Sequence, residues 1–405
     1  MGGLIGLCAS LVATSVGVTH FLENRNAAAR SATASAAAPA VAVESTTKSA
    51  PAPWGTLVTM DVDIQQPEEY VSFDTTAESG SAWVFPGQSL GQVKEALKTA
   101  GLSEEQVASA TVAGKVSDQS DGVTLKPDEE LLFSLKPDVR VRLYNVLAKW
   151  PQNKFMNSPY HLPGNFEEMA KRSGVSDEIV AMVGKLTYQN CGIKFFSDPE
   201  LVLSKIQSKD EQLLLLKALT YQTAVLARLH LDKDSDLDKI VGYWGSVPGV
   251  RAKDVRPLLE SVSRTAGGGT ISLLYLLPKF ARERLYTFPM PTQTGDTKMD
   301  CHWTALNFLN DEPDDRLQDS AFASQYIKDK FYQIGKPSQP GDVLFILDAE
   351  GGVIHSAVYI ADDIVFTKNG VNYAQPWILM RTKDLMDVYT RDQAPKALYY
   401  RRKDS

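Results

Sequence analysis

Cys301 and His355 are the residues whose types and surroundings best suit covalent chemistry in this chain. Cys301 follows Asp300 and begins the run 301–309, in which apolar residues recur at helical spacing. We therefore expect a buried helix with the Cys301 thiol in its first turn. A helix N-terminus and a nearby imidazolium both stabilise a thiolate, and they can lower a thiol's pKa from about 8.5 to roughly 3.5–7.5. The sequence thus predicts a nucleophile at Cys301.

Two strands are expected to bring an imidazole to this helix. The tripeptide 340–342 (Pro-Gly-Asp) turns the chain into the β-rich run 343–347, and after an acidic Gly-Gly turn comes a second β-rich run, 353–360. Alternation along the second run puts His355 on a face with apolar neighbours, which we expect to cover the helix that begins at Cys301. A histidine there could serve as the general base for the thiol.

A third strand could supply the residue that orients this imidazole. Alternation along the run 364–368 puts Thr367 and Asn369 on one face and Lys368 on the other. We expect one of the first two to bind the ring of His355. We favour Asn369, because an amide oxygen can accept a hydrogen bond from a ring N–H. Thr367 is the alternative.

Each of these residues also has an ordinary structural explanation. Cysteine is among the most often buried residue types, a strand histidine is usually a satisfied core residue, and Asn369-Gly370 is a common turn pair. The ordered series of Cys301, the Pro-Gly-Asp tripeptide and His355 is what favours a catalytic site. His302 is not expected to be the partner of Cys301, because neighbouring residues on a helix do not face each other.

Three sequence features together resemble the NlpC-type peptidases, a papain-like superfamily. They are the Asp-Cys pair at a helix start, the Pro-Gly-Asp turn before an apolar strand, and the run 355–360 (His-Ser-Ala-Val-Tyr-Ile) with acidic turn residues after it. The resemblance covers residues 275–400. It implies that Cys301 is the nucleophile and His355 the general base, with a polar residue on the next strand as the orienter. The family's upstream tyrosine, near the oxyanion site, would be Tyr286.

The chain departs from the family's pattern at two places. The small residues that usually follow the cysteine are replaced by His302 and Trp303. The orienter position, which is commonly a second histidine, falls near Thr367.

The resemblance implies a cysteine peptidase or amidohydrolase that acts outside the cytoplasm. Its substrate would be an amide bond of a peptide, with a peptidoglycan stem peptide as the implied case. Acyl transfer, or cleavage of another amide, is also compatible with these residues. An alternative from a different class is a catalytically inactive envelope protein that uses its papain-like domain for binding or scaffolding. Faster alkylation of Cys301 than of Cys191 would favour the enzyme.

Charge and motif content argue against several other classes. A net charge of −7 without a lysine- or arginine-rich stripe argues against a nucleic-acid binder. No cofactor or metal is expected. The glycines 267–269 lack the Gly-Lys-Ser/Thr ending of a phosphate loop, and the acidic cluster 311–315 lacks the ligand spacing of a calcium loop.

The three cysteines are too few for a disulfide scaffold. If the protein is exported, a disulfide between Cys191 and Cys301 is the alternative to a free nucleophile. We expect instead that Cys191 is a buried thiol in a loop or at a helix end.

The N-terminal segments indicate a cell-envelope protein. Residues 1–26 are expected to be a signal peptide or a membrane anchor, because 4–18 is apolar and uncharged but shorter than the roughly 20 residues that cross a bilayer comfortably. Extended, the segment 4–22 could tether the chain to a membrane. Residues 27–53 are rich in alanine, serine, threonine and proline, and they are expected to form a disordered linker.

The remaining chain is expected to have an α+β fold in three parts. Residues 54–137 should form a small α+β module, and 138–265 a mostly helical region whose longest helix covers 210–231. Residues 266–405 should form the papain-like domain, with the glycines 267–269 as a hinge before it.

Overall fold

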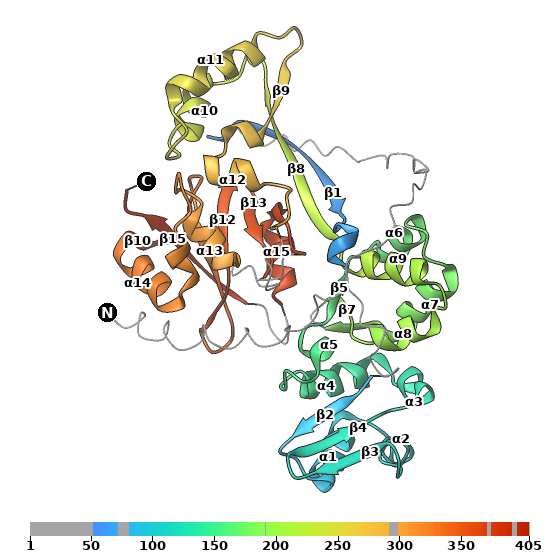
Figure 1. Ribbon diagram of the computed structural model, residues 1–405. Helices are drawn as coiled ribbons and strands as arrows, with labels where there is room; N and C mark the ends of the chain where they lie inside the picture. The colour runs from blue at the N-terminus through green and yellow to red at the C-terminus, as the bar shows by residue number, and fades with distance from the viewer. Residues whose placement is uncertain are drawn as a thin grey trace, which may run out of the picture. The chain divides into compact units, whose positions relative to one another are not determined.

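The computed structural model describes residues 52–71, 81–190, 192–290, 299–370, 374–390 and 395–404. The chain divides into two compact units. The C-terminal unit comprises the described residues up to Ile64, Gln222–Tyr389 and those from Pro395 onward, and the middle unit comprises Gln65–Tyr221 with Thr390. Both units combine helices with antiparallel sheets (Figure 1), so the predicted α+β class is confirmed.

The predicted signal or anchor segment, 1–26, lies outside the described residues, as does almost all of the predicted linker, 27–53. Within the described ranges, no helix combines the length and the apolar character that crossing a membrane requires.

A six-stranded antiparallel sheet forms the centre of the C-terminal unit. Its strand order is β10-β15-β11-β12-β13-β14. The strands are β10 (Phe331–Ile334), β11 (Val343–Leu347), β12 (Val353–Ala361), β13 (Ile364–Lys368), β14 (Trp377–Arg381) and β15 (Lys396–Arg402).

Helix α13 (Cys301–Asn307) packs on one face of this sheet. Phe308, just after the helix, meets Phe366 of β13 with ring centroids 5.6 Å apart. Leu306 joins the same core as Val358 and Ile360 of β12. Burying one such side chain stabilises the fold by about 1.5–3 kcal/mol, so this contact fixes the helix on the sheet.

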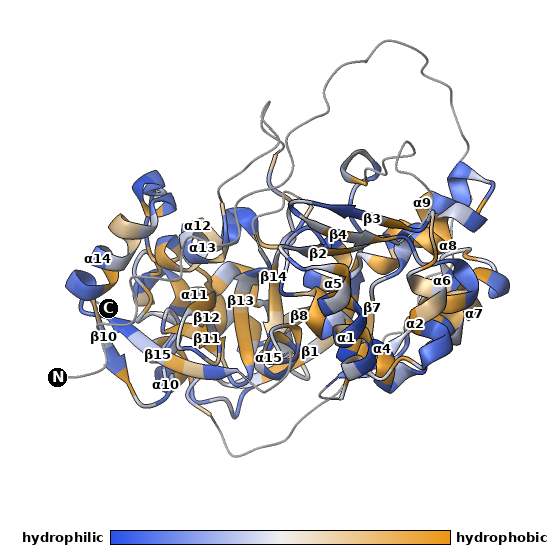
Figure 2. Cartoon of the chain, turned by 90° about the horizontal axis from the view of Figure 1, so that it is seen from below, coloured by the Kyte–Doolittle hydropathy of each residue, from blue (hydrophilic) through white to orange (hydrophobic). Residues whose placement is uncertain are grey.

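The opposite face of the sheet is buried as well. Leu344 and Ile346 of β11 form a second core there with Ala357 of β12 and Ile378 of β14. Helix α15 (Thr382–Val388) contributes Leu385 to it. Because both faces are covered, the central strands are buried on both sides rather than alternating between buried and exposed residues, and β11 is apolar throughout. Figure 2 shows the largely hydrophobic colouring of β12, β13 and β14.

The Pro-Gly-Asp tripeptide has a structural role where it leads into β11. Gly341 has a φ of 98°, and a Cβ there would lie 3.0 Å from the side chain of Leu309, so the turn requires glycine. The carboxylate of Asp342 is fully buried. It accepts the backbone N–H of Ser338 at 2.8 Å and pairs with Arg401 at 2.7 Å. This turn therefore joins β11 to β15.

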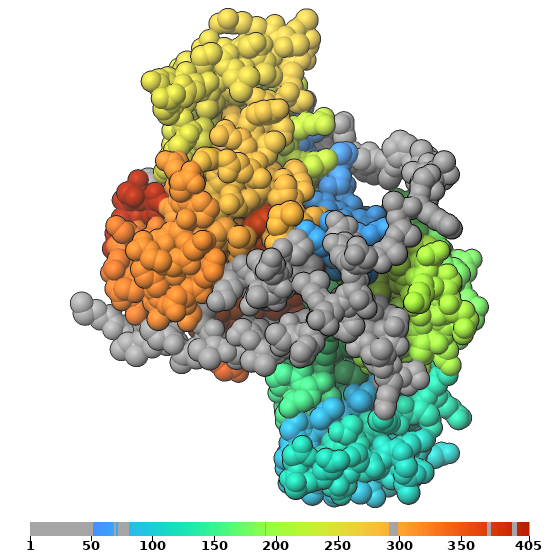
Figure 3. All heavy atoms as spheres, in the orientation of Figure 1, coloured from blue at the N-terminus to red at the C-terminus, as the bar shows by residue number. Residues whose placement is uncertain are grey.

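A second sheet in the C-terminal unit has the order β1-β8-β9. Its strands are β1 (Thr56–Ile64), β8 (Gln222–Leu231) and β9 (Gly269–Ser272), and α10 (Leu237–Trp244) and α11 (Ala252–Ser263) follow β8 along the chain. The remaining helical segments of this unit are η3 (Leu273–Leu276), α12 (Lys279–Arg284), η4 (Asp315–Gln318) and α14 (Ser320–Lys330), and α14 lies at the surface, in orange in Figure 3.

The predicted helix over 210–231 is wrong in its second half. Helix α9 (Lys209–Leu219) ends at Leu219, and the chain continues as strand β8, which pairs with β1 from Gln222 to His230. The run of leucines in α9 suggested one continuous helix. The backbone groups of β8 are instead hydrogen-bonded to β1, a strand far away in the sequence. The local residue pattern does not reveal such a partner.

The predicted domain boundaries also differ from the observed division. β1 and residues 222–265 belong to the C-terminal unit rather than to separate modules. Gly267 and Gly268, with φ of 80° and 85°, form a tight turn into β9 inside that unit, so they are not a hinge between domains.

The middle unit is built around a fully buried ion pair. Arg140 Nη1 lies 2.9 Å from Asp198 Oδ2, and the hydroxyl of Tyr144 donates to the same carboxylate at 2.8 Å. Its small sheets have the orders β2-β4-β3 and β5-β7-β6, formed by β2 (Trp83–Pro86), β3 (Val116–Gln119), β4 (Gly122–Leu125), β5 (Tyr160–Leu162), β6 (Tyr188–Asn190) and β7 (Ile193–Phe196). Its helices, apart from α9, are η2 (Glu68–Tyr70), α1 (Leu90–Ala100), α2 (Glu104–Ala110), α3 (Glu129–Ser134), α4 (Pro137–Leu147), α5 (Lys154–Asn157), α6 (Phe166–Arg172), α7 (Asp177–Leu186) and α8 (Pro199–Lys205).

Candidate active site

Cys301 stands at the first position of α13, which confirms the placement predicted from the sequence. Asp300 caps the helix, and its side chain accepts the backbone N–H of Trp303 at 2.7 Å. The thiol is buried, with 6% of the residue exposed, and it is a free thiol. The predicted alternative partner, Cys191, lies outside the described residues. The positive end of the helix dipole favours a thiolate at this position.

His355 is fully buried and projects from β12 on the side of Ala357. This is the face of the sheet opposite the one on which α13 packs, so the expectation that the His355 face covers α13 is wrong. Its Nε2 lies 2.8 Å from the hydroxyl oxygen of Thr367, on the neighbouring strand β13. The ladder between β12 and β13 runs from Ala361–Ile364 to Val358–Phe366. His355 and Thr367 both lie beyond its end, where their side chains meet. Thr367 is therefore the residue that orients the ring.

The preference for Asn369 as the orienter is wrong. The amide nitrogen of Asn369 lies 3.2 Å from Met380 Sδ and 3.5 Å from Gln222 Oε1. Its amide oxygen, the atom expected to accept the ring N–H, has no hydrogen-bond partner within the described part of the chain. The reason is local: β13 ends at Lys368, so the alternation that placed Asn369 beside Thr367 does not extend to it.

Tyr286 is not positioned as an oxyanion donor. Its hydroxyl donates to the backbone carbonyl of Val225 in β8 at 2.6 Å, so this proton is already bound. The residue has a φ of 63°, an uncommon backbone conformation for a tyrosine. Its ring packs between the two cores of the C-terminal unit, which gives it a structural role.

His302 does interact with Cys301, contrary to the expectation from helix geometry. Its Nδ1 lies 2.6 Å from the hydroxyl of Ser356 on β12. Burial alone would lower the pKa of His302, but the charge and hydrogen bonding of Cys301, helped by the carboxylate of Asp300, raise it to about 9. The contact with Ser356 holds the ring of His302 beside the start of the helix, and residue spacing along the helix does not reveal this tertiary contact.

Both imidazoles act on the thiol. Burial works to raise the pKa of Cys301, yet the charges of His302 and His355 hold it well below the usual value for a thiol. Nδ1 of His355 is buried and has no partner with hydrogen-bond geometry among the described residues. The ring is thus close to the thiol but not aligned with it. Catalytic hydrogen bonds are often long in unliganded sites and tighten when substrate binds, so the Cys301–His355 hydrogen bond stays a prediction.

Two further residues of the site were not expected from the sequence. The ring of Tyr389, after α15, stacks on His355 with centroids 4.2 Å apart. Lys368 is fully buried, and its ammonium donates to the carbonyl of Gly370 at 2.7 Å. Burial lowers the pKa of Lys368 to about 8, while the charges of Cys301 and Asp300 oppose that shift.

Strand pairing shows why Lys368 lies near the thiol. Lys368 pairs directly with Trp377 of β14, so the two side chains share a face of the sheet. The indole N–H of Trp377 donates to the hydroxyl of Thr304 in α13 at 3.0 Å. Alternation correctly assigned Lys368 to the face opposite Thr367. It could not show that the start of α13 covers that face, because a tertiary contact determines this.

Other candidate sites are explained by structure. In the acidic cluster 311–315, Asp314 caps η4 and Asp315 accepts the indole N–H of Trp303 at 3.2 Å. Among the described residues, no group of three or more His, Cys, Asp or Glu side chains could hold a metal ion.

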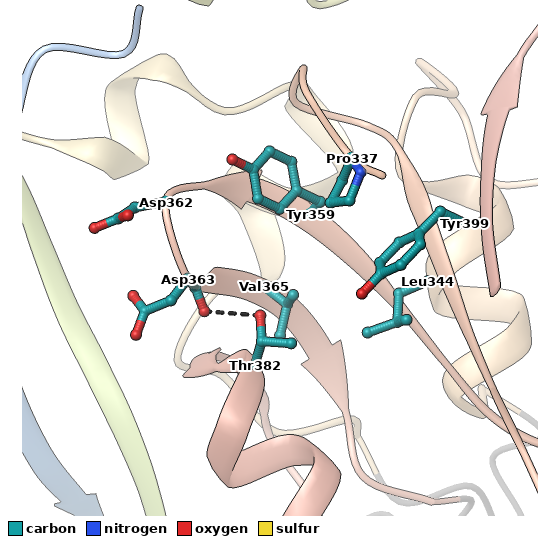
Figure 4. A pocket seen from close by; sticks show the side chains of 8 residues that line it. All are labelled: Pro337, Leu344, Tyr359, Asp362, Asp363, Val365, Thr382 and Tyr399. Atoms are coloured by element: carbon teal, nitrogen blue, oxygen red, sulfur yellow. Dashed lines mark hydrogen bonds between the residues drawn. The ribbon is translucent and has the colours of Figure 1, made fainter. Parts of the chain in front are cut away.

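A pocket of about 250 Å³ in the C-terminal unit lies apart from the candidate catalytic residues (Figure 4). Its lining residues include Tyr359, Asp362 and Tyr399, and neither Cys301 nor His355 lines it.

No protein-family model, curated protein or solved structure matches this chain. The function must therefore be inferred from the geometry and electrostatics of the site.

Proposed function

We propose that this chain is a cysteine peptidase or amidohydrolase with a papain-like, NlpC-type catalytic domain. One observation carries the proposal: Cys301 begins a helix beside two imidazoles that hold its pKa well below the ordinary value. Burial alone would have the opposite effect, since it raises the pKa of a thiol. A structural cysteine gains nothing from such surroundings, whereas a nucleophile depends on them.

In the proposed reaction, the thiol proton of Cys301 passes to His355, and the sulfur attacks the carbonyl carbon of an amide. The carbonyl oxygen takes the negative charge of the tetrahedral intermediate. The C–N bond then breaks, His355 gives its proton to the leaving amine, and a thioester remains on Cys301. Water activated by His355 releases the acid. An amine in place of water would complete an acyl transfer instead.

We also propose a substrate class and a compartment for this activity. A peptidoglycan stem peptide is the implied substrate, and an apolar N-terminal segment followed by an alanine- and proline-rich stretch supports action in the cell envelope. Nucleic acid is a poor substrate for a chain with a net charge of −7.

The proposal is tested by incubating the purified chain with a panel of stem peptides and analysing the products by mass spectrometry. We expect one amide bond to be cleaved by the unmodified chain, and neither Cys301→Ala nor His355→Gln to cleave it. Asn369→Ala serves as a control outside the proton-transfer chain. Cleavage that survives Cys301→Ala would contradict the mechanism, and binding without cleavage would favour the envelope binding module.

A further inference from the structure

The two imidazoles beside Cys301 are each held by a hydroxyl group. Ser356 lies 2.6 Å from Nδ1 of His302, and Thr367 lies 2.8 Å from Nε2 of His355. Ser356 and His355 are consecutive residues of β12, so one short stretch of strand positions both rings. Each ring is fixed through one nitrogen, and its second nitrogen is left to interact with the thiol or with substrate.

The two rings nevertheless have different electrostatic surroundings. The negative charges of Cys301 and Asp300 favour the protonated form of His302 and raise its pKa to about 9, so this ring keeps its proton at neutral pH. His355 instead stacks on the neutral ring of Tyr389 and has a buried Nδ1 without a partner among the described residues. Among the residues that the structure describes, the charged or titratable groups around the thiol are Asp300, His302, His355, Lys368 and Tyr389.

We propose that the two imidazoles divide the work at Cys301. His302 stays protonated throughout and is the fixed cation beside the thiolate, whereas His355 takes the thiol proton and delivers it to the leaving amine. No bond of His302 forms or breaks in this scheme. The division of roles rests on the proposed cysteine chemistry, but the role of His302 toward the thiolate does not require that any amide be cleaved.

The roles are separated by His302→Gln and His355→Gln in the full chain, because glutamine is polar but carries no charge. The rate of Cys301 alkylation by iodoacetamide is measured against pH through the mass of its peptide. We expect His302→Gln to raise the midpoint by at least one pH unit, so that the rate below the midpoint falls about ten-fold or more. At a pH above the new midpoint the rate should equal that of the unmodified chain.

The amide-cleavage profile then distinguishes a fixed cation from a proton carrier. His302→Gln should regain most of its activity once the pH exceeds the new midpoint, because His355 still carries the proton. His355→Gln should stay inactive at every pH. An unchanged alkylation midpoint in His302→Gln would overturn the proposal, and so would inactivity of that variant at a pH where its thiolate forms.

Ser356→Ala gives a second measure if His302→Gln folds poorly. It removes only the hydroxyl that holds His302, and we expect a smaller upward shift of the midpoint; no shift would count against the proposal. A chain that cleaves no amide but shows these shifts would contradict the proposed function while supporting the role of His302.

Discussion

At the scale of single residues, the site depends on which partner fixes the ring of His355. Alternation along β13 correctly placed Thr367 among the candidates, because side-chain direction in a strand is a local property, but it wrongly extended the strand to Asn369. It could not choose between them. That choice depended on where β13 ends and on how β12 and β13 separate beyond Val358–Phe366, and both are set by tertiary packing.

Thr367→Val removes the hydroxyl while keeping the shape of the side chain. We expect it to lower kcat by at least about ten-fold, because general acid–base catalysis contributes about 10²–10⁴-fold and requires a correctly oriented ring. Asn369→Ala is the matched control and should keep kcat near that of the unmodified chain. Equal kcat in Thr367→Val, or a loss only in Asn369→Ala, would contradict the assigned orienter. Steady-state kinetics below the unfolding temperature provide the measurement.

Lys368 allows a stability test in which the size of the effect depends on pH. Its folded pKa of about 8 lies below the ordinary 10.5, so the buried charged form destabilises the native state below pH 8. Lys368→Met should therefore raise the free energy of unfolding at pH 7 by up to about 3 kcal/mol. The gain should shrink as the pH rises from 8 to 10.5, because the lysine in the unfolded chain then also becomes neutral.

The same substitution should lower turnover, since it removes a cation close to Cys301. Urea unfolding at pH 7 and pH 10 checks the stability effect. A variant less stable than the unmodified chain at pH 7, or a gain that does not depend on pH, would show that the burial of Lys368 is not costly.

At the scale of elements, the helix that begins at Cys301 and the strands β11 to β13 are where the sequence predicted them. Their signals are local: an N-cap aspartate, a Pro-Gly-Asp turn and short β-rich runs. Strand β8 was mistaken for helix because its pairing partner, β1, lies far away in the chain. His302 and Tyr389 were missed as site residues for the same physical reason, since their contacts depend on which elements pack together.

The turn before β11 gives a prediction at this scale. Arg401 holds the buried carboxylate of Asp342 through two bonds of 2.7 Å. Arg401→Met should lower the free energy of unfolding by about 3 kcal/mol or more, because it leaves a buried charge without its partner. The control Arg316→Met breaks the exposed pair with Asp314 and should cost less than about 1 kcal/mol. Similar costs for the two variants in urea unfolding would contradict this role for the turn.

At the scale of the whole molecule, the candidate catalytic domain was expected to occupy 266–405 alone. The observed C-terminal unit also takes in β1 and residues 222–265. Arg381 of β14 reaches Thr59 of β1 at 3.0 Å, and Tyr286 bonds to β8. Composition and turn signals indicate where loops lie. They do not reveal that β1, which precedes the middle unit in the sequence, pairs with β8, which follows it.

A chain that begins at Gln65 should therefore lose the stability of its C-terminal unit. It lacks β1, and the backbone groups of β8 that pair with β1 would be left without their partners. Hydrogen exchange should show faster exchange in β8 and β14 than in a chain that begins at Ala52. Equal protection in the two chains would mean that 266–405 is self-sufficient, as the sequence suggested.

The proposed mechanism requires that Cys301 is held as a thiolate before substrate binds. Its most direct test is the pH dependence of alkylation in the unmodified chain, with each cysteine followed through the mass of its own peptide. We predict that Cys301 reacts with iodoacetamide with a midpoint well below about 8.5 and, at neutral pH, faster than Cys191. A midpoint at or above about 8.5, with Cys301 reacting no faster than Cys191, would contradict the proposed mechanism.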